Sequence, residues 1–158
     1  MAATGILGMT ISTSATALTN IEAAADAIGD FTALTIATTI GLVENFPPIG
    51  RMFQDVPFTV IGGRVYHLKG AFDMAPGPLV VAADFSDAGQ LALKGYAEAI
   101  DQATYPFKIV LTGADASYDT IYFGAKIMSC VLQMGDANTV LRANIQLGFS
   151  TPMYIGAA

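Results

Sequence analysis

The sequence predicts a mainly β protein, an antiparallel β-sandwich or barrel-like sheet with one flanking α-helix at about residues 87–101. Three observations support this fold class. Several segments alternate apolar and polar residues at the strand period, most regularly in residues 139–149. Only one segment combines the 3.6-residue period of an amphipathic helix with a clear start signal. Strands and helices do not alternate along the chain, which argues against a parallel doubly wound sheet.

The predicted helix begins at a capping signal. Ser86 or Asp87 can accept a hydrogen bond from the free backbone amides of the first turn, and Asp87 precedes Gln90 at the spacing of a capping box. Apolar residues then follow at helical spacing: Leu93, Tyr96, Ala97 and Ile100. The helix therefore has one apolar face, which we expect to pack on a sheet.

Strands are expected on both sides of this helix. In chain order they are 6–12, one long strand over 31–43 bent at Gly41, then 56–61, 64–72, 79–82, 105–111, 120–132 and 139–149. Gly62-Gly63 can adopt positive φ and so predicts a hairpin turn between two of them. A short helical turn is expected near 21–28. Residues 151–158 are expected to form a C-terminal tail that can add to a neighbour, and 1–158 to form a single domain.

The segment 44–58 is expected to be a long, Pro-interrupted loop. Pro47, Pro48 and Pro57 cannot donate hydrogen bonds within a sheet. The segment also carries more large apolar side chains than a solvated loop would: Phe46, Ile49, Met52, Phe53 and Phe58. We expect something outside the domain to cover them. The alternative is that the loop folds back over its own core.

The composition indicates self-assembly. The chain is 53% hydrophobic and 13% charged, about half the usual charged share, so an isolated molecule would expose apolar patches. No apolar run approaches the ~20 residues of a membrane span, and the first residues lack the features of a secretory signal. We therefore expect a cytoplasmic product. Acidic residues exceed basic ones by 13 to 7, which disfavours DNA binding and suits a surface that DNA passes without being held.

The sequence offers little for catalysis. His67 is the only histidine and lies in a predicted strand without a nucleophile at a known spacing. Cys130, the only cysteine, is expected to pack as a small apolar residue. Asp84 and Asp87 are explained by the start of the helix, and no glycine motif for phosphate precedes a helix. We expect no catalytic, cofactor-binding or metal-binding residues, and hence no enzyme.

Five fragments in a fixed order carry a resemblance to a known family. They are GLVENF (41–46), GRVYHLKGAFD (63–73), PLVVAADFSDAGQLAL (78–93), YPFKIVL (105–111) and YFGAKIMSCVLQMGDANTVLRANIQL (122–147). The most specific elements are LKG, then AxDxSDAGQxxL, then YxFKIxL. With these fragments the sequence resembles the major tail tube proteins of bacteriophages with long, non-contractile tails, over nearly the whole chain.

The resemblance implies a β-sandwich with a flanking helix whose subunits form hexameric rings. The rings stack into the tail tube, which conducts double-stranded DNA during ejection. The implied location is the virion tail, assembled in the cytoplasm of the host bacterium, with no cofactor and no membrane. The implied partners are copies of the same chain, a tape-measure protein, and tail-terminator and distal tail proteins. DNA would pass without specific binding.

Two sets of residues are candidates for assembly contacts within this framework. Phe46, Ile49, Met52, Phe53 and Phe58 are expected at the contact between rings. Lys126, Arg142, Asn144 and Gln146 are expected at the lumen or at the seam between subunits, although an ordinary solvated face would give the same pattern. Two other functions fit the sequence: a capsid decoration or tail-completion protein, and a monomeric ligand-binding β-sandwich.

Overall fold

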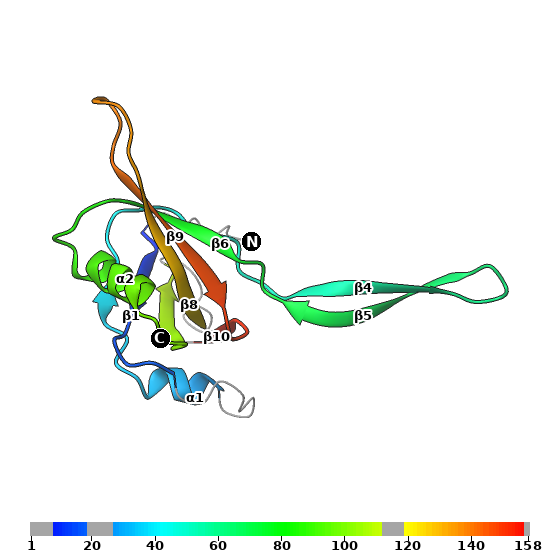
Figure 1. Cartoon of the computed structure of the whole chain (residues 1–158). Helices are drawn as coiled ribbons and strands as arrows, with labels where there is room; N and C mark the ends of the chain where they lie inside the picture. The colour runs from blue at the N-terminus through cyan, green and yellow to red at the C-terminus, as the bar shows by residue number, and fades with distance from the viewer. Residues whose placement is uncertain (1–7, 19–26, 112–118, 157–158) are drawn as a thin grey trace.

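The structure is a computed structural model of the chain and describes residues 8–18, 27–111 and 119–156 (Figure 1). These residues form a mainly β, antiparallel, sandwich-like fold, as the alternation predicts. The elements are β1 (Thr10–Thr13), α1 (Ala27–Thr32), β2 (Thr38–Thr39), β3 (Val43–Asn45), β4 (Met52–Thr59), β5 (Val65–Asp73), β6 (Gly77–Ala82), α2 (Ala88–Glu98), β7 (Tyr105–Val110), β8 (Thr120–Gln133), β9 (Arg142–Phe149) and β10 (Tyr154–Gly156).

The main sheet has the strand order β2-β1-β7-β8-β9-β6-β3, and β10 also pairs with β8. Strand β8 joins its two halves. Residues 120–125 pair with β7, whereas residues 125–133 pair with β9. The register shifts between Ile127 and Ser129, and such a bulge bends a strand. One core therefore receives side chains from both halves of the sheet, among them Ile11, Leu79, Val81, Phe107, Phe123 and Ile145.

Helix α2 begins where the capping signal predicts and ends at Glu98, three residues earlier than expected. Asp87 accepts a hydrogen bond from the backbone amide of Gln90 at 2.8 Å and another from that of Gly41 at 3.2 Å. Leu93 is fully buried, as expected of the apolar face. Ile100 was expected on the same face, but it lies beyond the end of the helix and is fully exposed.

Gln90 does not complete the predicted capping box. Its buried side chain instead accepts from the backbone amide of Asp84 at 2.9 Å. It donates to the carbonyls of Gly41 at 3.0 Å and Ala82 at 2.9 Å. One amide side chain thus joins the start of α2 to the segment before β3 and to the end of β6. This cross-link explains why the helix sits at this end of the sheet.

The single long strand predicted over 31–43 is wrong. Phe31 belongs to α1, and its ring packs 5.8 Å from the rings of Tyr122 and Tyr154. Only the short strands β2 and β3 remain from this run. The break between them follows from the bonds of the Gly41 backbone to α2 and from Leu42, which has a positive φ of 55°. The strand propensity of the threonines is overridden by these tertiary contacts.

Strands β4 and β5 form a separate two-stranded sheet that projects far from the body (Figure 1). The predicted hairpin turn is confirmed: Gly63 has φ of 77° and donates to the Val60 carbonyl. The prediction of an irregular loop over 44–58 is wrong in its second half, because Met52–Thr59 is strand β4. Pro57 is tolerated there because the strand has a neighbour on one side only.

The C-terminal segment differs from expectation. Residues 151–158 were expected to be free to add to a neighbour, yet Tyr154–Gly156 forms β10 and pairs with β8 of the same chain. Tyr154 faces Tyr122 in this pairing. The ring contact with Phe31 then closes α1 over the same strands. The helical turn predicted at 21–28 lies mostly outside the described residues.

Candidate assembly interface

The most exposed feature of the structure is the arm, defined here as residues 51–73. It contains β4, β5 and their turn, and nearly every residue in both strands is exposed. The arm carries more than half of the exposed large apolar side chains among the described residues: Met52, Phe53, Val56, Phe58, Val60, Ile61, Val65, Tyr66, Leu68 and Phe72. A solitary hairpin with this much apolar surface is marginally stable in water, so contact with another surface would stabilise the arm.

The two faces of the arm differ in character. The register pairs Phe58 with Tyr66 and Val56 with Leu68, which places these four side chains on one face. The rings of Phe58 and Tyr66 stack at 5.4 Å. The opposite face carries a hydrogen bond between His67 and Asp55, with 2.8 Å between Nδ1 and Oδ2. We call the first of these the apolar face of the arm.

The arm is also cationic relative to the rest of the chain. Arg51, Arg64 and Lys69 outnumber Asp55 and Asp73, so the arm has a net charge of +1 with His67 neutral. The total is −6, and the remainder of the chain therefore carries −7. Each arm cation lies over an aromatic ring, at 4.9 to 5.5 Å from its centroid. Such contacts hold cations beside apolar surface at little cost.

The structure divides the five candidates for the ring contact into two groups. Met52, Phe53 and Phe58 lie on the arm and are exposed. Phe46 and Ile49 pack against the main core, and the ring of Phe46 meets that of Phe123 edge-on at 5.9 Å. For these two residues the structure shows the alternative, a segment folded back over its own core. They therefore contribute to stability, and their place at a contact between rings stays a prediction.

Replacing Phe46 by Ala is expected to lower the free energy of unfolding by about 2–4 kcal/mol, because it removes a half-buried ring that packs against the core cluster. The measurement is urea unfolding followed by circular dichroism. Replacing the exposed Leu91 by Gln is the control and is expected to change stability by less than about 0.5 kcal/mol. A Phe46 variant as stable as the parent would contradict the core assignment.

The four candidates for the lumen or subunit seam share one face of the sheet. Arg142, Asn144 and Gln146 alternate with buried residues on β9, and Lys126 faces Gly148 on the neighbouring β8. Two are already engaged within the chain. The Arg142 guanidinium lies 2.6 Å from a carboxylate oxygen of Glu44, and Lys126 donates to Gln102 at 3.2 Å. Their role in a lumen or seam stays a prediction.

A groove runs between α2 and the second half of β8. Two adjoining pockets of about 320 and 240 Å³ form it, and both are lined by Ala97 and Met128. No described strand pairs with residues 126–133 on the side away from β9, so the groove contains an open strand edge. Further apolar lining includes Phe85, Ile100, Ile127 and Leu132. We call this the α2–β8 groove.

Cys130 lines the same groove, and burial raises the pKa of its thiol. Lys94 opposes this shift and Glu98 adds to it. The thiol is therefore protonated at neutral pH, and the reactive thiolate increases only as pH rises toward the raised pKa. Reaction with iodoacetamide at pH 7.5 is expected to be at least about threefold slower than that of a free cysteine peptide. If Cys130 reacted as fast as the free cysteine peptide at every pH from 7 to 9, the result would contradict a raised pKa.

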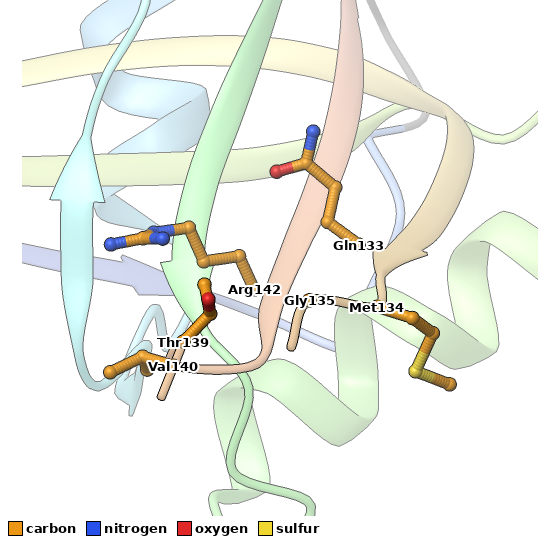
Figure 2. A pocket seen from close by; sticks show the side chains of 6 residues that line it. All are labelled: Gln133, Met134, Gly135, Thr139, Val140 and Arg142. Atoms are coloured by element: carbon orange, nitrogen blue, oxygen red, sulfur yellow. The ribbon is translucent and has the colours of Figure 1, made fainter. Parts of the chain in front are cut away.

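A further small pocket of about 270 Å³ lies at the β8–β9 turn (Figure 2). It is lined by Gln133, Met134, Gly135, Thr139, Val140 and Arg142. Figure 2 shows the Met134 side chain pointing away from that of Arg142. Beside it, Asp136 accepts from the Thr139 hydroxyl at 2.5 Å, and this bond lowers the pKa of the Asp136 carboxyl. This bond explains the geometry of the turn.

The described residues contain no group of three or more His, Cys, Asp or Glu side chains placed to hold a metal ion. Among the same residues, no helix is long and apolar enough to cross a membrane.

The comparisons with known proteins identify the fold. No protein-family profile matches the chain, and no curated protein matches it in sequence. A chain in the cryo-EM structure of the sheath/tube terminator of an extracellular contractile injection system, PVC, in its extended state superposes with a TM-score of 0.68 at 12% identity, over 99% of both chains. A chain in the 6-fold symmetrised baseplate of the anti-feeding prophage superposes with a TM-score of 0.63 at 11% identity, over 94% of this chain and 91% of that chain.

The likeness extends over nearly the full length of all three chains. At such low identity it establishes the fold and leaves the function to be argued from this chain's own surfaces. One of the similar chains comes from the structure of a sheath/tube terminator and the other from that of a baseplate.

Proposed function

We propose that this chain is a structural subunit, with no catalytic role, of a phage tail or phage-tail-like particle. In this proposal copies of the chain form hexameric rings that stack into a tube. The observation that carries the proposal is the arm, an apolar hairpin that projects from the body and that the described remainder of the chain leaves uncovered. A neighbouring copy is the simplest cover. The full-length fold likeness to components of two tail-like particles supports this reading.

The resemblance in sequence and the net charge of −6 support the finer part of the proposal, a tube that conducts double-stranded DNA. A negative inner surface repels the phosphate backbone and lets DNA move without being held. The partners proposed with it are a tape-measure protein within the tube and terminator and distal tail proteins at its ends. The particle would be assembled in the cytoplasm of the host bacterium and act as part of the virion tail.

A tail-completion protein is the second candidate. The observation in its favour is the fold likeness to a chain of a sheath/tube terminator, over 99% of both chains. A completion protein would use the same fold to form one ring at the end of a tube. It would not polymerise further, since only one side of the ring would bind another ring.

Negative-stain electron microscopy of the purified chain tests the proposal. Long tubes with a central channel are the expected result. Discrete rings or small oligomers that never lengthen, at any concentration or salt, would favour the completion protein or a capsid decoration protein. A chain that remains monomeric at millimolar concentration in light scattering would overturn these readings and favour a monomeric ligand-binding β-sandwich.

A further inference from the structure

We propose that the arm of one copy docks in the α2–β8 groove of a second copy, where strand β5 pairs with the open edge of β8. This inference rests on the proposed function, because it names the surfaces that form one of the repeated assembly contacts. The occupant of the groove is thus the arm of another copy.

The placement of the two surfaces requires a contact between copies. The arm and helix α2 lie on opposite sides of the body (Figure 1), so an arm points away from the groove of its own chain. A contact between two different surfaces is heterologous, and it leaves one free arm and one free groove on every added copy. Such a contact closes a ring or extends a filament.

The hydrogen bonding of the hairpin determines which edge of the arm can pair with a strand of another copy. The amide of Val60 donates to the Arg64 carbonyl at 3.1 Å, which makes these residues a hydrogen-bonded pair. Antiparallel pairs alternate, so the facing residues Pro57 and His67 form a pair without mutual hydrogen bonds. The nitrogen of Pro57 therefore lies on the outer edge of β4, where it cannot donate to another strand.

The outer edge of β5 lacks no backbone hydrogen-bond donor. It contains no proline, and the backbone groups of Val65, His67 and Lys69 point outward by the same alternation. Strand β5 spans 9 residues, similar in length to the open stretch 126–133 of β8. Pairing of the two satisfies both rows of backbone groups, which is the basis of binding by strand addition.

The apolar side chains of the two surfaces are compatible, and the charges of the groove itself balance, with Lys94 and Lys126 against Glu98 and Asp101. In the proposed pairing the apolar face of the arm lies toward α2, against the apolar lining of the groove that includes Phe85, Ala97, Met128 and Leu132. The cationic arm approaches a body with a net charge of −7. Long-range attraction of this sign accelerates association and weakens as salt is raised.

Cys130 provides a direct test because it lies in the groove and is the only cysteine of the chain. A tagged variant carrying Leu68→Cys or Tyr66→Cys together with Cys130→Ser has one thiol, on the apolar face of the arm. It is assembled with an excess of the unaltered chain and oxidised with copper phenanthroline. The expected product is a disulfide between the tagged variant and Cys130 of the unaltered chain, identified by mass spectrometry.

The matched control is His67→Cys with Cys130→Ser, which places the thiol between those positions on the opposite face of β5. It is expected to give at least about tenfold less of this product, since its side chain points away from the groove. Particles that form normally but give no such disulfide from position 66 or 68, or give it equally from position 67, would overturn the docking site and leave the proposed function intact. A mixture that stays monomeric would overturn both.

Discussion

Replacing Phe53 and Phe58 by Ser is expected to abolish self-assembly while the body of the protein stays folded. Both rings are exposed on the arm, and each contacts an aromatic neighbour on β5, Phe72 and Tyr66 respectively. Burying the exposed part of two such rings in a neighbouring copy contributes about 2–4 kcal/mol to the free energy of association at each contact. This is equivalent to roughly 30- to 1,000-fold in the association constant. Because every copy repeats the contact, the loss prevents growth of a long assembly.

The measurement is electron microscopy and sedimentation of the double variant, with circular dichroism to monitor the fold. A second variant removes 53–72 and joins Met52 to Asp73 through Asn-Gly, which is possible because these two residues face each other at the base of the arm. Its melting temperature is expected within about 3 °C of the parent, since the arm adds nothing to the main core. The control is Leu91→Gln, which removes an exposed apolar side chain from α2 and is expected to assemble. Normal assembly of either arm variant would show that the arm is not the contact.

Replacing Gln90 by Leu is expected to lower the free energy of unfolding by about 2–4 kcal/mol. The substitution leaves three backbone groups without their partner: the amide of Asp84 and the carbonyls of Gly41 and Ala82. Each group that loses a hydrogen bond in a buried setting costs about 1–3 kcal/mol, and partial access of water reduces the sum. Because the side chains of Leu and Gln have similar volumes, the loss of stability measures the missing hydrogen bonds and not a cavity.

Urea unfolding of the Gln90 variants measures this loss. Replacement by Glu is expected to be as damaging as replacement by Leu, because a carboxylate retains the bond from Asp84 but cannot donate to the two carbonyls. Asp87→Ala provides a comparison in the same region. It removes the helix cap and the bond from Gly41, and we expect it to cost about 1–2 kcal/mol. Stability of Gln90→Leu equal to that of the parent would contradict the cross-linking role of this amide.

Local sequence patterns predicted those elements whose tertiary contacts favour the same backbone conformation as the propensity of their own residues. Strands β6 to β9 were predicted to within a few residues at their ends, because alternation and strand propensity coincide there. The start of α2 was predicted because Asp87 caps the helix through bonds that lie within four residues. The hairpin turn was predicted because Gly63 can adopt a positive φ.

The incorrect predictions share a cause, which is contact with residues distant in the chain. Residues 31–43 have strand propensity, but Phe31 packs on Tyr122 and Tyr154, and the Gly41 backbone is bound by the start of α2. The α2–β8 groove had no signal in the sequence. Its open edge exists because β7 pairs with only the first half of β8, and no local window contains that information.

The sequence by itself determined that this is a β-rich protein with one amphipathic helix and with too few charges to cover its apolar surface. These properties depend on composition and on the periods of the two backbone conformations, which are local. Only the tertiary structure decided which apolar residues of 44–58 are covered. The ring of Phe46 contacts that of Phe123 at the core, whereas Phe53 and Phe58 lie on the arm, which projects away from the body (Figure 1). Burial depends on where the chain places distant partners, and residues of the same type within one short segment can therefore be covered or exposed.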